Sequence, residues 1–284
     1  MTLCRKTIRL FSGRECGSSQ PHFPVFFRGG PAKAGPNAFR PPLPAFLPAL
    51  LLLLLLLCAR PAAAERLTYA LAWGLVPVGE MALETGPGFF PHAEVLVARL
   101  TARSNAFVDL FLPVQNAYST RWDRAADRSL HFTREAHTGR STSTGEMFLD
   151  QPPSQYLLLE DGRWANTLQA PGPLLDPLSL LLSLRRETLA PGAEARRPVT
   201  DGRRTANATA KATEWEEVQT PLGGFRTLRV EVDMAGVEGL FGIRDRLVRI
   251  WAAPAEDNLP VKVQAAVRIG PWSGTLTARL QARD

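Results

Sequence analysis

No motif that positions a catalytic nucleophile occurs in this 284-residue chain. Its cysteines, Cys4, Cys16 and Cys58, all lie near the N-terminus, and no Gly-x-Ser-x-Gly elbow occurs anywhere. A serine or cysteine hydrolase needs such a nucleophile beside a positioned base. The sequence therefore offers no candidate for nucleophilic catalysis.

Histidines are the next candidates for acid–base or metal chemistry. After residue 64 they are His92, His131 and His137, whose spacing does not match a zinc site. No thiolate lies near them to complete a ligand set. We expect surface or strand-end positions for all of them, and no metal or other cofactor.

A cluster of acids flanks Trp215 and is the last candidate for catalysis. In a strand, alternation would put Glu214 and Glu216 on one face, with Glu217 on the other. Two neighbouring carboxylates suit acid–base work, but a charged face in water is the commoner reason for them. No role of an active site can be assigned, so the sequence predicts a protein that is not an enzyme.

A run of eight leucines, residues 50–57, is the clearest sorting feature. The apolar stretch of residues 45–59 is shorter than the roughly 20 residues that span a bilayer. Ala62 and Ala64 then provide the small residues that signal peptidase requires. We predict an export signal over residues 1–64, cleaved between Ala64 and Glu65, and a periplasmic location.

Two other interpretations of this segment remain open. The leucines would also suit an uncleaved anchor, whereas lipidation at Cys58 is disfavoured because Leu57 occupies the preceding position, which needs a small residue. Residues 1–44 are long for the start of a signal, which a translation start assigned too early would explain.

The balance of basic and acidic residues differs on the two sides of the predicted cleavage site. Residues 1–64 hold eight basic residues and one acid, which leaves 25 basic and 26 acidic residues in the rest of the chain. A domain with this balance lacks the basic surface that nucleic-acid binding needs. The exported part also has no cysteine, so it must be stabilised by its core alone. Its length, residues 65–284, suits a single β-rich domain.

Alternating apolar residues predict strands through most of this region. Residues 67, 69, 71 and 73 alternate at its start, and residues 261–269 do so near its end. Asp161-Gly162 and Asp201-Gly202 are typical of tight hairpin turns. We expect a mainly β fold, a curved antiparallel sheet or open barrel of about 10–13 strands by this strand-and-turn spacing.

One buried helix is predicted near residues 177–189. Asp176 is a good N-cap and Pro177 suits the first helical position. The leucines that follow occupy nearly all sides, as in a helix surrounded by other elements. Such a helix would pack in the concavity of a curved sheet or plug one end of a barrel.

Several short motifs, in order and spacing, resemble the exported bacterial family called domain of unknown function 3108. They are residues 69–73 with Gly79 and Leu83, the Asp176-Pro177-Leu178-Ser179 helix start with Leu184-Arg185, Trp251 with Leu259-Pro260-Val261-Lys262, Ile269-Gly270, and residues 276–280. The resemblance spans residues 66–282 and implies an exported, β-rich protein. It implies no activity, and it gives Asp176, Pro177, Ser179, Arg185, Pro260 and Gly270 structural roles. An extra proline, Pro254, departs from the pattern in the turn after Trp251.

These features favour a binding protein. We expect an apolar pocket between helix and sheet, holding a lipid, another apolar ligand or a peptide, and lined by Leu178, Leu181, Leu182, Trp73 and Trp251. The alternative is a scaffold or assembly factor for another envelope protein, which would present an exposed apolar patch or an unpaired edge strand. In either case the membrane is met only through the export signal.

Overall fold

The structure is a computed structural model that describes residues 64–88, 94–151, 155–170, 172–188, 190–240, 247–269 and 272–284. The described residues lie within one compact unit, Ala59–Asp284. The predicted export signal up to residue 63, including Cys58, and Gly270 lie outside the described residues. No helix in the described part is long and apolar enough to cross a bilayer.

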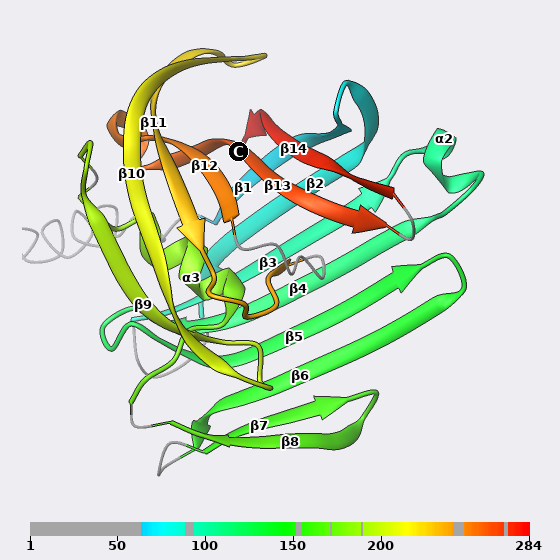
Figure 1. Cartoon of the computed structure of the whole chain (residues 1–284), viewed down its shortest axis with the longest axis vertical. Coiled ribbons are helices and arrows are strands. Elements are labelled where there is room, and N and C mark those ends of the chain that lie inside the picture. The colour runs from blue at the N-terminus through cyan, green and yellow to red at the C-terminus, as the bar shows by residue number, and fades with distance from the viewer. Residues whose placement is uncertain are drawn as a thin grey trace, which may run out of the picture. The chain divides into compact units, whose positions relative to one another are not determined.

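Fourteen strands form one antiparallel sheet (Figure 1). In the first half the strands are β1 Glu65–Trp73, β2 Val76–Pro87, β3 Val95–Ser104, β4 Val114–Asp123, β5 Arg128–Thr138, β6 Ser141–Gln151, β7 Gln155–Glu160 and β8 Arg163–Gln169. In the second half they are β9 Glu194–Thr200, β10 Thr205–Thr220, β11 Gly223–Asp233, β12 Leu247–Ala253, β13 Leu259–Ile269 and β14 Trp272–Arg283. The helices of the described residues are α2 Ala106–Asp109, α3 Pro177–Leu184 and the 3-10 turn η2 Pro254–Glu256.

The two halves of the sheet are joined by the first and last strands that the structure describes, β1 and β14. β1 pairs with β2 on one side and with β14 on the other, from Leu67 opposite Arg283 to Trp73 opposite Leu276. From this junction the strand order runs outward in sequence to β8 at one edge and back through the chain to β9 at the other. Each half is a meander of neighbouring hairpins, as the turn spacing predicts.

The mainly β class is confirmed, but the number of strands exceeds the expected 10–13. The edge strands β8 and β9 contain few apolar residues and expose most of one face, so only the predicted hairpin turns at Asp161-Gly162 and Asp201-Gly202 indicate them. One strand was instead predicted as two. The alternation suggests separate strands over residues 205–212 and 215–219, but the structure has the single strand β10 there. A bulge between Ala212 and Trp215 interrupts its alternation without ending it.

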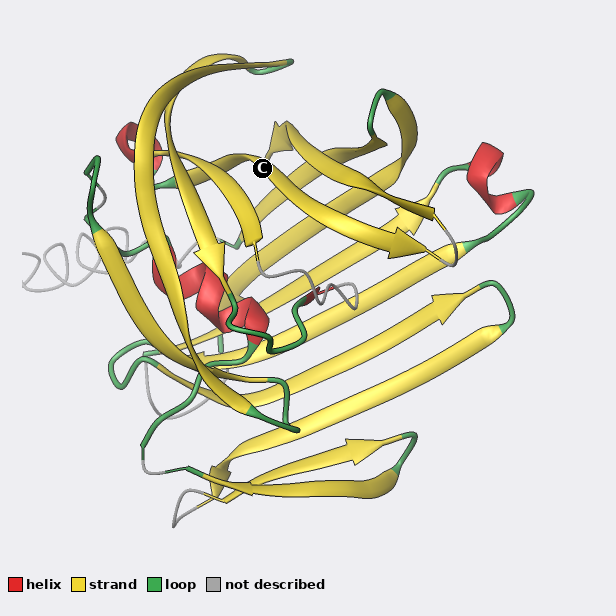
Figure 2. Ribbon diagram, viewed as in Figure 1, coloured by secondary structure: helices red, strands yellow, loops and turns green. Residues whose placement is uncertain are grey.

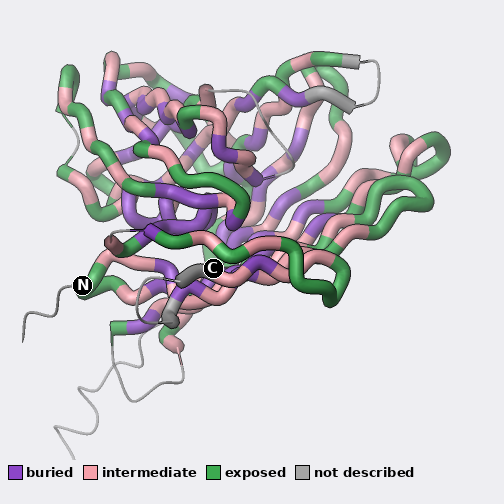
Figure 3. Tube along the Cα trace, turned by 60° about the horizontal axis from the view of Figure 1, so that its bottom comes forward, coloured by how far each residue is buried: buried purple, intermediate pink, exposed green. Residues whose placement is uncertain are grey.

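The core lies on the concave face of the sheet. Alternation places Leu67, Tyr69 and Leu71 of β1 on this face, all of them buried, while Thr68 and Ala70 face the other way. Figure 3 shows the same banding of buried and more exposed residues along many of the strands. Burial of one face per strand fixes the register, because a one-residue slip would turn the apolar set outward.

Helix α3 lies in this concavity (Figure 2). It begins as predicted, with Asp176 as N-cap and Pro177 in the first turn, and all but one of its residues are buried. It ends at Leu184 rather than near residue 189. After Leu184 the backbone tightens, because the N–H groups of Arg186 and Glu187 donate to the carbonyl oxygens of Ser183 and Leu184. The side-chain amide of Asn258 donates to the carbonyl oxygens of Arg185 and Glu187 at 2.8 Å each and so pairs them outside a helix.

A buried carboxylate fastens the start of α3 to the sheet. Oδ1 of Asp176 accepts the backbone N–H groups of Leu178 and Ser179, at 2.8 and 3.0 Å. Its Oδ2 accepts the hydroxyls of Thr120 and Ser129 at 2.6 Å each, and that of Ser179 at 2.7 Å. Asp176 is fully buried, so these five hydrogen bonds replace all of its water.

The segment before α3 also bridges the two halves of the open sheet. The carbonyl of Leu174 accepts the backbone N–H of Ser129 on β5, and Leu175 exchanges backbone hydrogen bonds with Pro198 and Thr200 on β9, all at 2.9 Å. The edge strand β9 is thereby tied to β5 through residues 174–175. The sheet is nearly closed, although its edge strands do not pair with one another.

Replacing Asp176 should be the most costly polar substitution in the core. Asp176→Ala removes the helix cap and leaves three buried hydroxyls without their acceptor, so we expect a loss of about 4 kcal/mol in the free energy of unfolding. Asp176→Asn keeps one oxygen for the cap, and the hydroxyls can rotate to accept its amide, so the loss should be about half as large. Urea denaturation measures both.

The N-cap of α2 provides the matched control. Asn105 accepts the backbone N–H of Val108 at an exposed helix start, so Asn105→Ala should cost about 1 kcal/mol. If Asp176→Ala were no more damaging than Asn105→Ala, the buried carboxylate would not have the fastening role described above.

Candidate functional site

An apolar cavity of about 140 Å³ lies between α3 and the concave face of the sheet. Leu178, Leu181 and Leu182 lie on its helix side. Residues of β1–β3 and β11–β14, among them Val230 and Ala278, line it from the sheet, together with residues of the segment 234–240. Only Tyr69, Arg185 and Asn258 contribute polar side chains to the described wall.

Helical spacing explains how α3 serves both the cavity and the fold. Residues 178, 181 and 182 are separated by three and four positions, so they share one face of the helix. Ser179 and Ser183 point elsewhere: Ser179 joins the Asp176 network, and Ser183 donates to Asp127 at 3.1 Å. One face of the helix is therefore polar and fixed, while the leucine face borders the cavity.

Small side chains on the opposite strands leave the space that the leucines do not fill. Ala252 of β12, Ala265 of β13 and Ala278 of β14 all line the cavity. In an otherwise close-packed interior, such a group of alanines facing a leucine helix leaves a void. The cavity thus follows from side-chain volumes and needs no irregularity of the backbone.

The two tryptophans expected in the wall lie elsewhere. Trp73 is half-buried and packs against Ala265 and Val267; Ala265 lines the cavity, but Trp73 itself does not. It sits so close to Gly274 that a Cβ there would meet its indole. Trp73 therefore extends the same apolar face toward the other end of β1.

Trp251 is a correction to the predicted pocket, because it lies on the opposite face of β12 from the cavity residues Ile250 and Ala252. Its indole N–H donates to Glu216 at 2.7 Å, and the Lys262 ammonium lies 3.8 Å from its ring centroid. Partial burial, and then the nearby Arg279, lower the pKa of Lys262. Trp251 is buried because the long β10–β11 hairpin bends over this side of the sheet (Figure 1).

The remaining predicted candidates for chemistry have structural partners. Glu214 and Glu216 both form ion pairs with Arg229, at 2.8 and 2.9 Å. His131 contacts Glu146 at 2.7 Å and His137 contacts Thr142 at 3.0 Å, whereas His92 lies outside the described residues. The described part of the chain contains no group of three or more potential metal-ligating side chains.

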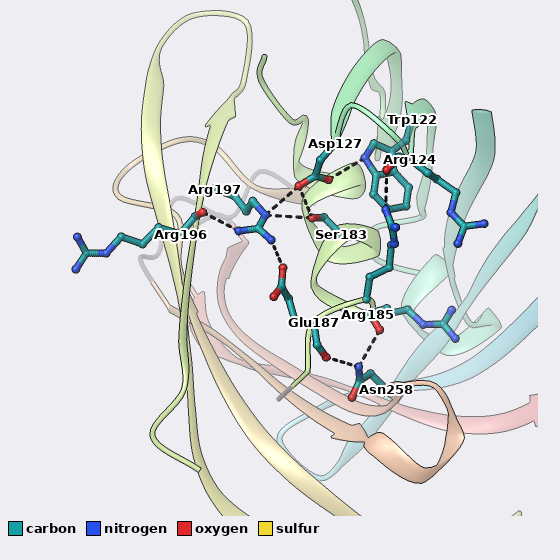
Figure 4. A network of polar contacts seen from close by, with 10 residues as sticks. Trp122, Arg124, Asp127, Ser183, Arg185, Glu187, Arg196, Arg197 and Asn258 are labelled. Carbon is teal, nitrogen blue, oxygen red and sulfur yellow. Dashed lines mark hydrogen bonds and ion pairs between the residues drawn. The ribbon is translucent and has the colours of Figure 1, made fainter. Parts of the chain in front are cut away.

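A polar network that the sequence did not reveal holds α3 against β9 (Figure 4). The guanidinium of Arg197 donates to Asp127 at 2.9 Å and also contacts Glu187. Asp127 accepts the indole N–H of Trp122 at 3.2 Å as well. Adjacent arginines are usually solvated, so nothing in the sequence indicated that Arg197 would connect elements across the gap between the two edges.

Charges also cross this gap beside the cavity. Arg134 of β5 pairs with Glu238 at 3.2 Å, and Arg203, in the turn after β9, pairs with Glu160 of β7. These residues surround a small recess of about 30 Å³, which shares Pro177 and Gly239 with the wall of the main cavity. The gap between the edges is thus closed by side chains at this end.

The polar side chains of the cavity wall gather where β1, α3 and β13 meet. Arg185 forms a two-point ion pair with Glu65, at 2.7 and 3.3 Å. The Tyr69 hydroxyl donates to the carbonyl oxygen of Pro260 at 2.9 Å. Burial raises the pKa of Tyr69 far above its ordinary value. To smaller extents, the positive charge of Arg185 lowers this pKa and the negative charge of Glu65 raises it.

Comparison with models of protein families assigns the chain to a family. The model of the family described as "Protein of unknown function (DUF3108)" matches residues 68–279, so this chain belongs to that family. The match includes nearly all of the sheet and the whole of α3. It confirms the family indicated by the sequence motifs.

A solved structure has a similar fold. It is described as the crystal structure of a β-barrel-like protein of domain of unknown function DUF1849 from Brucella abortus. The TM-score is 0.50 at 11% sequence identity, over 79% of this chain and 98% of that one. The similarity supports the barrel-like architecture alone. A search among curated proteins finds no match for the chain.

The buried phenol of Tyr69 should make stability depend on alkaline pH. Because the folded state holds the phenol proton more tightly, the unfolded chain loses it first, and the free energy of unfolding should fall as pH rises above about 10. Tyr69→Phe removes this contribution. Urea denaturation between about pH 9 and about pH 11 should therefore show a shallower decline for Tyr69→Phe than for the unaltered chain. Parallel declines would contradict the effect of burial.

Proposed function

We propose that this protein is an exported envelope protein, without enzymatic activity, that binds a small apolar ligand between α3 and the concave face of its sheet. The observation that carries the proposal is the cavity of about 140 Å³ with an almost wholly apolar wall. Packed protein interiors contain few voids of this size, and apolar ones stay free of water.

The size of the cavity limits the ligand. A cavity of roughly 150 Å³ lined by aliphatic side chains is known to accept benzene, whereas sites for drug-sized ligands measure about 300 Å³ or more. The 140 Å³ here therefore suits a single ring or a short branched chain. A whole lipid or a peptide exceeds this volume, so the ligand class is narrower than the sequence suggests.

The envelope location rests on the predicted export signal. Its support is the leucine run of residues 50–57 followed by Ala62 and Ala64. A cysteine-free domain after this segment is compatible with an oxidising compartment, because it has no thiol to protect.

Filling the cavity should abolish ligand binding. Leu181 lines the cavity and is only partly buried, so Leu181→Trp should place an indole in the ligand's space. Native mass spectrometry of protein purified from the envelope of its own cell should show a bound small molecule in the unaltered protein and none in Leu181→Trp.

The matched control is Leu180→Met on the same helix. Leu180 is buried but does not line the cavity, and this exchange nearly conserves volume. It should retain the ligand. A ligand that persists in Leu181→Trp, or an unaltered protein that never carries one, would count against the proposal.

A specific observation also favours the alternative, an assembly factor for another envelope protein. Large apolar side chains are exposed at one end of the sheet, with Leu75 99%, Leu110 77% and Phe111 77% accessible. The loop of α2 and the start of β2 are neighbours, because Asn105 donates to the carbonyl oxygens of Pro77 and, through its backbone, Val78. Such clusters often mark interaction sites.

The apolar end can be tested separately from the cavity. Phe107 and Phe111 are exposed and their rings lie 5.7 Å apart, so replacing both with serine should reduce capture of a partner from envelope extracts. Leu222→Ser, at the exposed β10–β11 turn, is the control that removes a comparable apolar side chain elsewhere. Equal capture by both variants would argue against this surface.

A further inference from the structure

The exposed apolar side chains of the structure gather at one end of the sheet. Among the described residues, eight large apolar side chains are exposed, and six of them lie in or beside the turns at this end. They are Leu75, Val76, Phe107, Leu110, Phe111 and Trp164. The other two, Trp215 and Leu222, belong to the β10–β11 hairpin. This uneven distribution makes the end a candidate contact surface.

The topology of the sheet brings these side chains together from separate hairpins. Alternate turns of an antiparallel meander lie at the same end, so the β1–β2, β3–β4, β5–β6 and β7–β8 turns share it. Figure 1 shows α2, which belongs to the β3–β4 connection, on the same side of the view as the β5–β6 and β7–β8 turns. The backbone N–H of Gly139 also donates to the carbonyl oxygen of Pro113 at 2.8 Å. The apolar side chains therefore project from neighbouring tips and do not line a groove.

Much of the backbone at these tips is hydrogen-bonded within the protein. The N–H groups of Phe111 and Leu112 donate to the carbonyl oxygen of Val108, at 3.0 and 2.9 Å. That of Gly74 donates to the carbonyl oxygen of Thr275 at 3.0 Å. Backbone groups that approach the apolar part of a bilayer need such internal partners. A protein partner that adds a strand would instead use the edge strands β8 or β9. The tips thus suit insertion between lipids.

Two arginines at this end are free to meet lipid headgroups. Arg140, in the β5–β6 turn, and Arg163, beside Trp164, are exposed and have no hydrogen-bond or ionic partner among the described residues. The acids in the same turns, Asp109 and Asp161, each accept a hydrogen bond from the protein. A guanidinium group with free donors pairs well with phosphate. A phospholipid surface offers phosphates and apolar chains at one boundary, which matches tips that carry both arginines and apolar side chains.

We propose that the folded domain rests with this end on the surface of a phospholipid bilayer. Its exposed phenylalanines and leucines lie among the lipid chains, and Arg140 and Arg163 lie at the phosphates. Apolar and aromatic side chains of this kind hold a protein at the lipid boundary without spanning it. The inference goes beyond the proposed function, since it needs no ligand in the cavity. It adds a contact of the folded domain to the membrane contact expected through the export signal.

Two exposed tryptophans provide a position-specific test, because Trp164 lies at this end and Trp215 does not. Vesicles of phosphatidylcholine and phosphatidylglycerol with brominated acyl chains should quench the fluorescence of protein purified from the envelope. Trp164→Phe should lose a measurable part of this drop in emission, whereas Trp215→Phe should keep it. The comparison reports which tryptophan meets the lipid, so it holds even where the leucine run of residues 50–57 binds lipid by itself. An equal drop in emission for Trp164→Phe and the unaltered protein would overturn the proposal.

Replacing both phenylalanines of the α2 segment tests the apolar insertion. Phe107→Ser combined with Phe111→Ser should weaken partition onto these vesicles about tenfold or more, since two phenyl rings no longer leave water. Leu222→Ser removes an exposed apolar side chain elsewhere and should leave partition unchanged. Arg140→Ser combined with Arg163→Ser should weaken partition too, by a factor that shrinks as salt is added.

The outcomes separate this inference from the proposed function. Equal partition of the phenylalanine variant and Leu222→Ser would overturn the bilayer contact. So would absence of vesicle binding, and capture of a protein that only the phenylalanine variant loses would then favour the assembly factor. A cavity that proves empty would contradict the proposed ligand and leave this inference standing.

Discussion

The buried carboxylate of Asp176 is the interaction on which the rest of the structure depends. It caps α3 through two backbone N–H groups and ties the same helix to β4 and β5 through Thr120 and Ser129. A short helix of eight residues has little stability of its own, so it needs such an anchor to hold one orientation. Because the anchor fixes the helix rotation, it also decides which leucines face the cavity.

Much of the fold could be predicted from the sequence because its signals are local. Alternation over residues 261–269 indicates β13, and the Asp176-Pro177 pair indicates the start of α3. What failed depended on distant partners. The carbonyl oxygens just past the end of α3 are paired by Asn258, and β9 becomes a strand because β10 and Leu175 supply its hydrogen bonds.

In the candidate site, too, the features with local signals could be predicted and those that depend on distant residues could not. Three leucines on one helical face follow from the helical period, so the wall residues Leu178, Leu181 and Leu182 could be predicted. Alternation places Trp251 on the opposite face of its strand from Ile250 and Ala252. It does not say which of these two faces lines the cavity, or that the β10–β11 hairpin covers the other one. The place of Asn258 in the wall had no signal in the sequence, because its partners, the carbonyl oxygens of Arg185 and Glu187, are distant in the chain.

The pairing of β1 with β14 has a consequence for how the chain acquires its fold. Protein synthesis delivers β1 first and β14 last, so one side of β1 stays without its partner until the whole domain has emerged. Contacts between such distant parts of a chain form slowly. Until they form, an open strand edge is available to neighbouring molecules. The nascent domain therefore keeps this edge of β1 open until β14 arrives to pair with it.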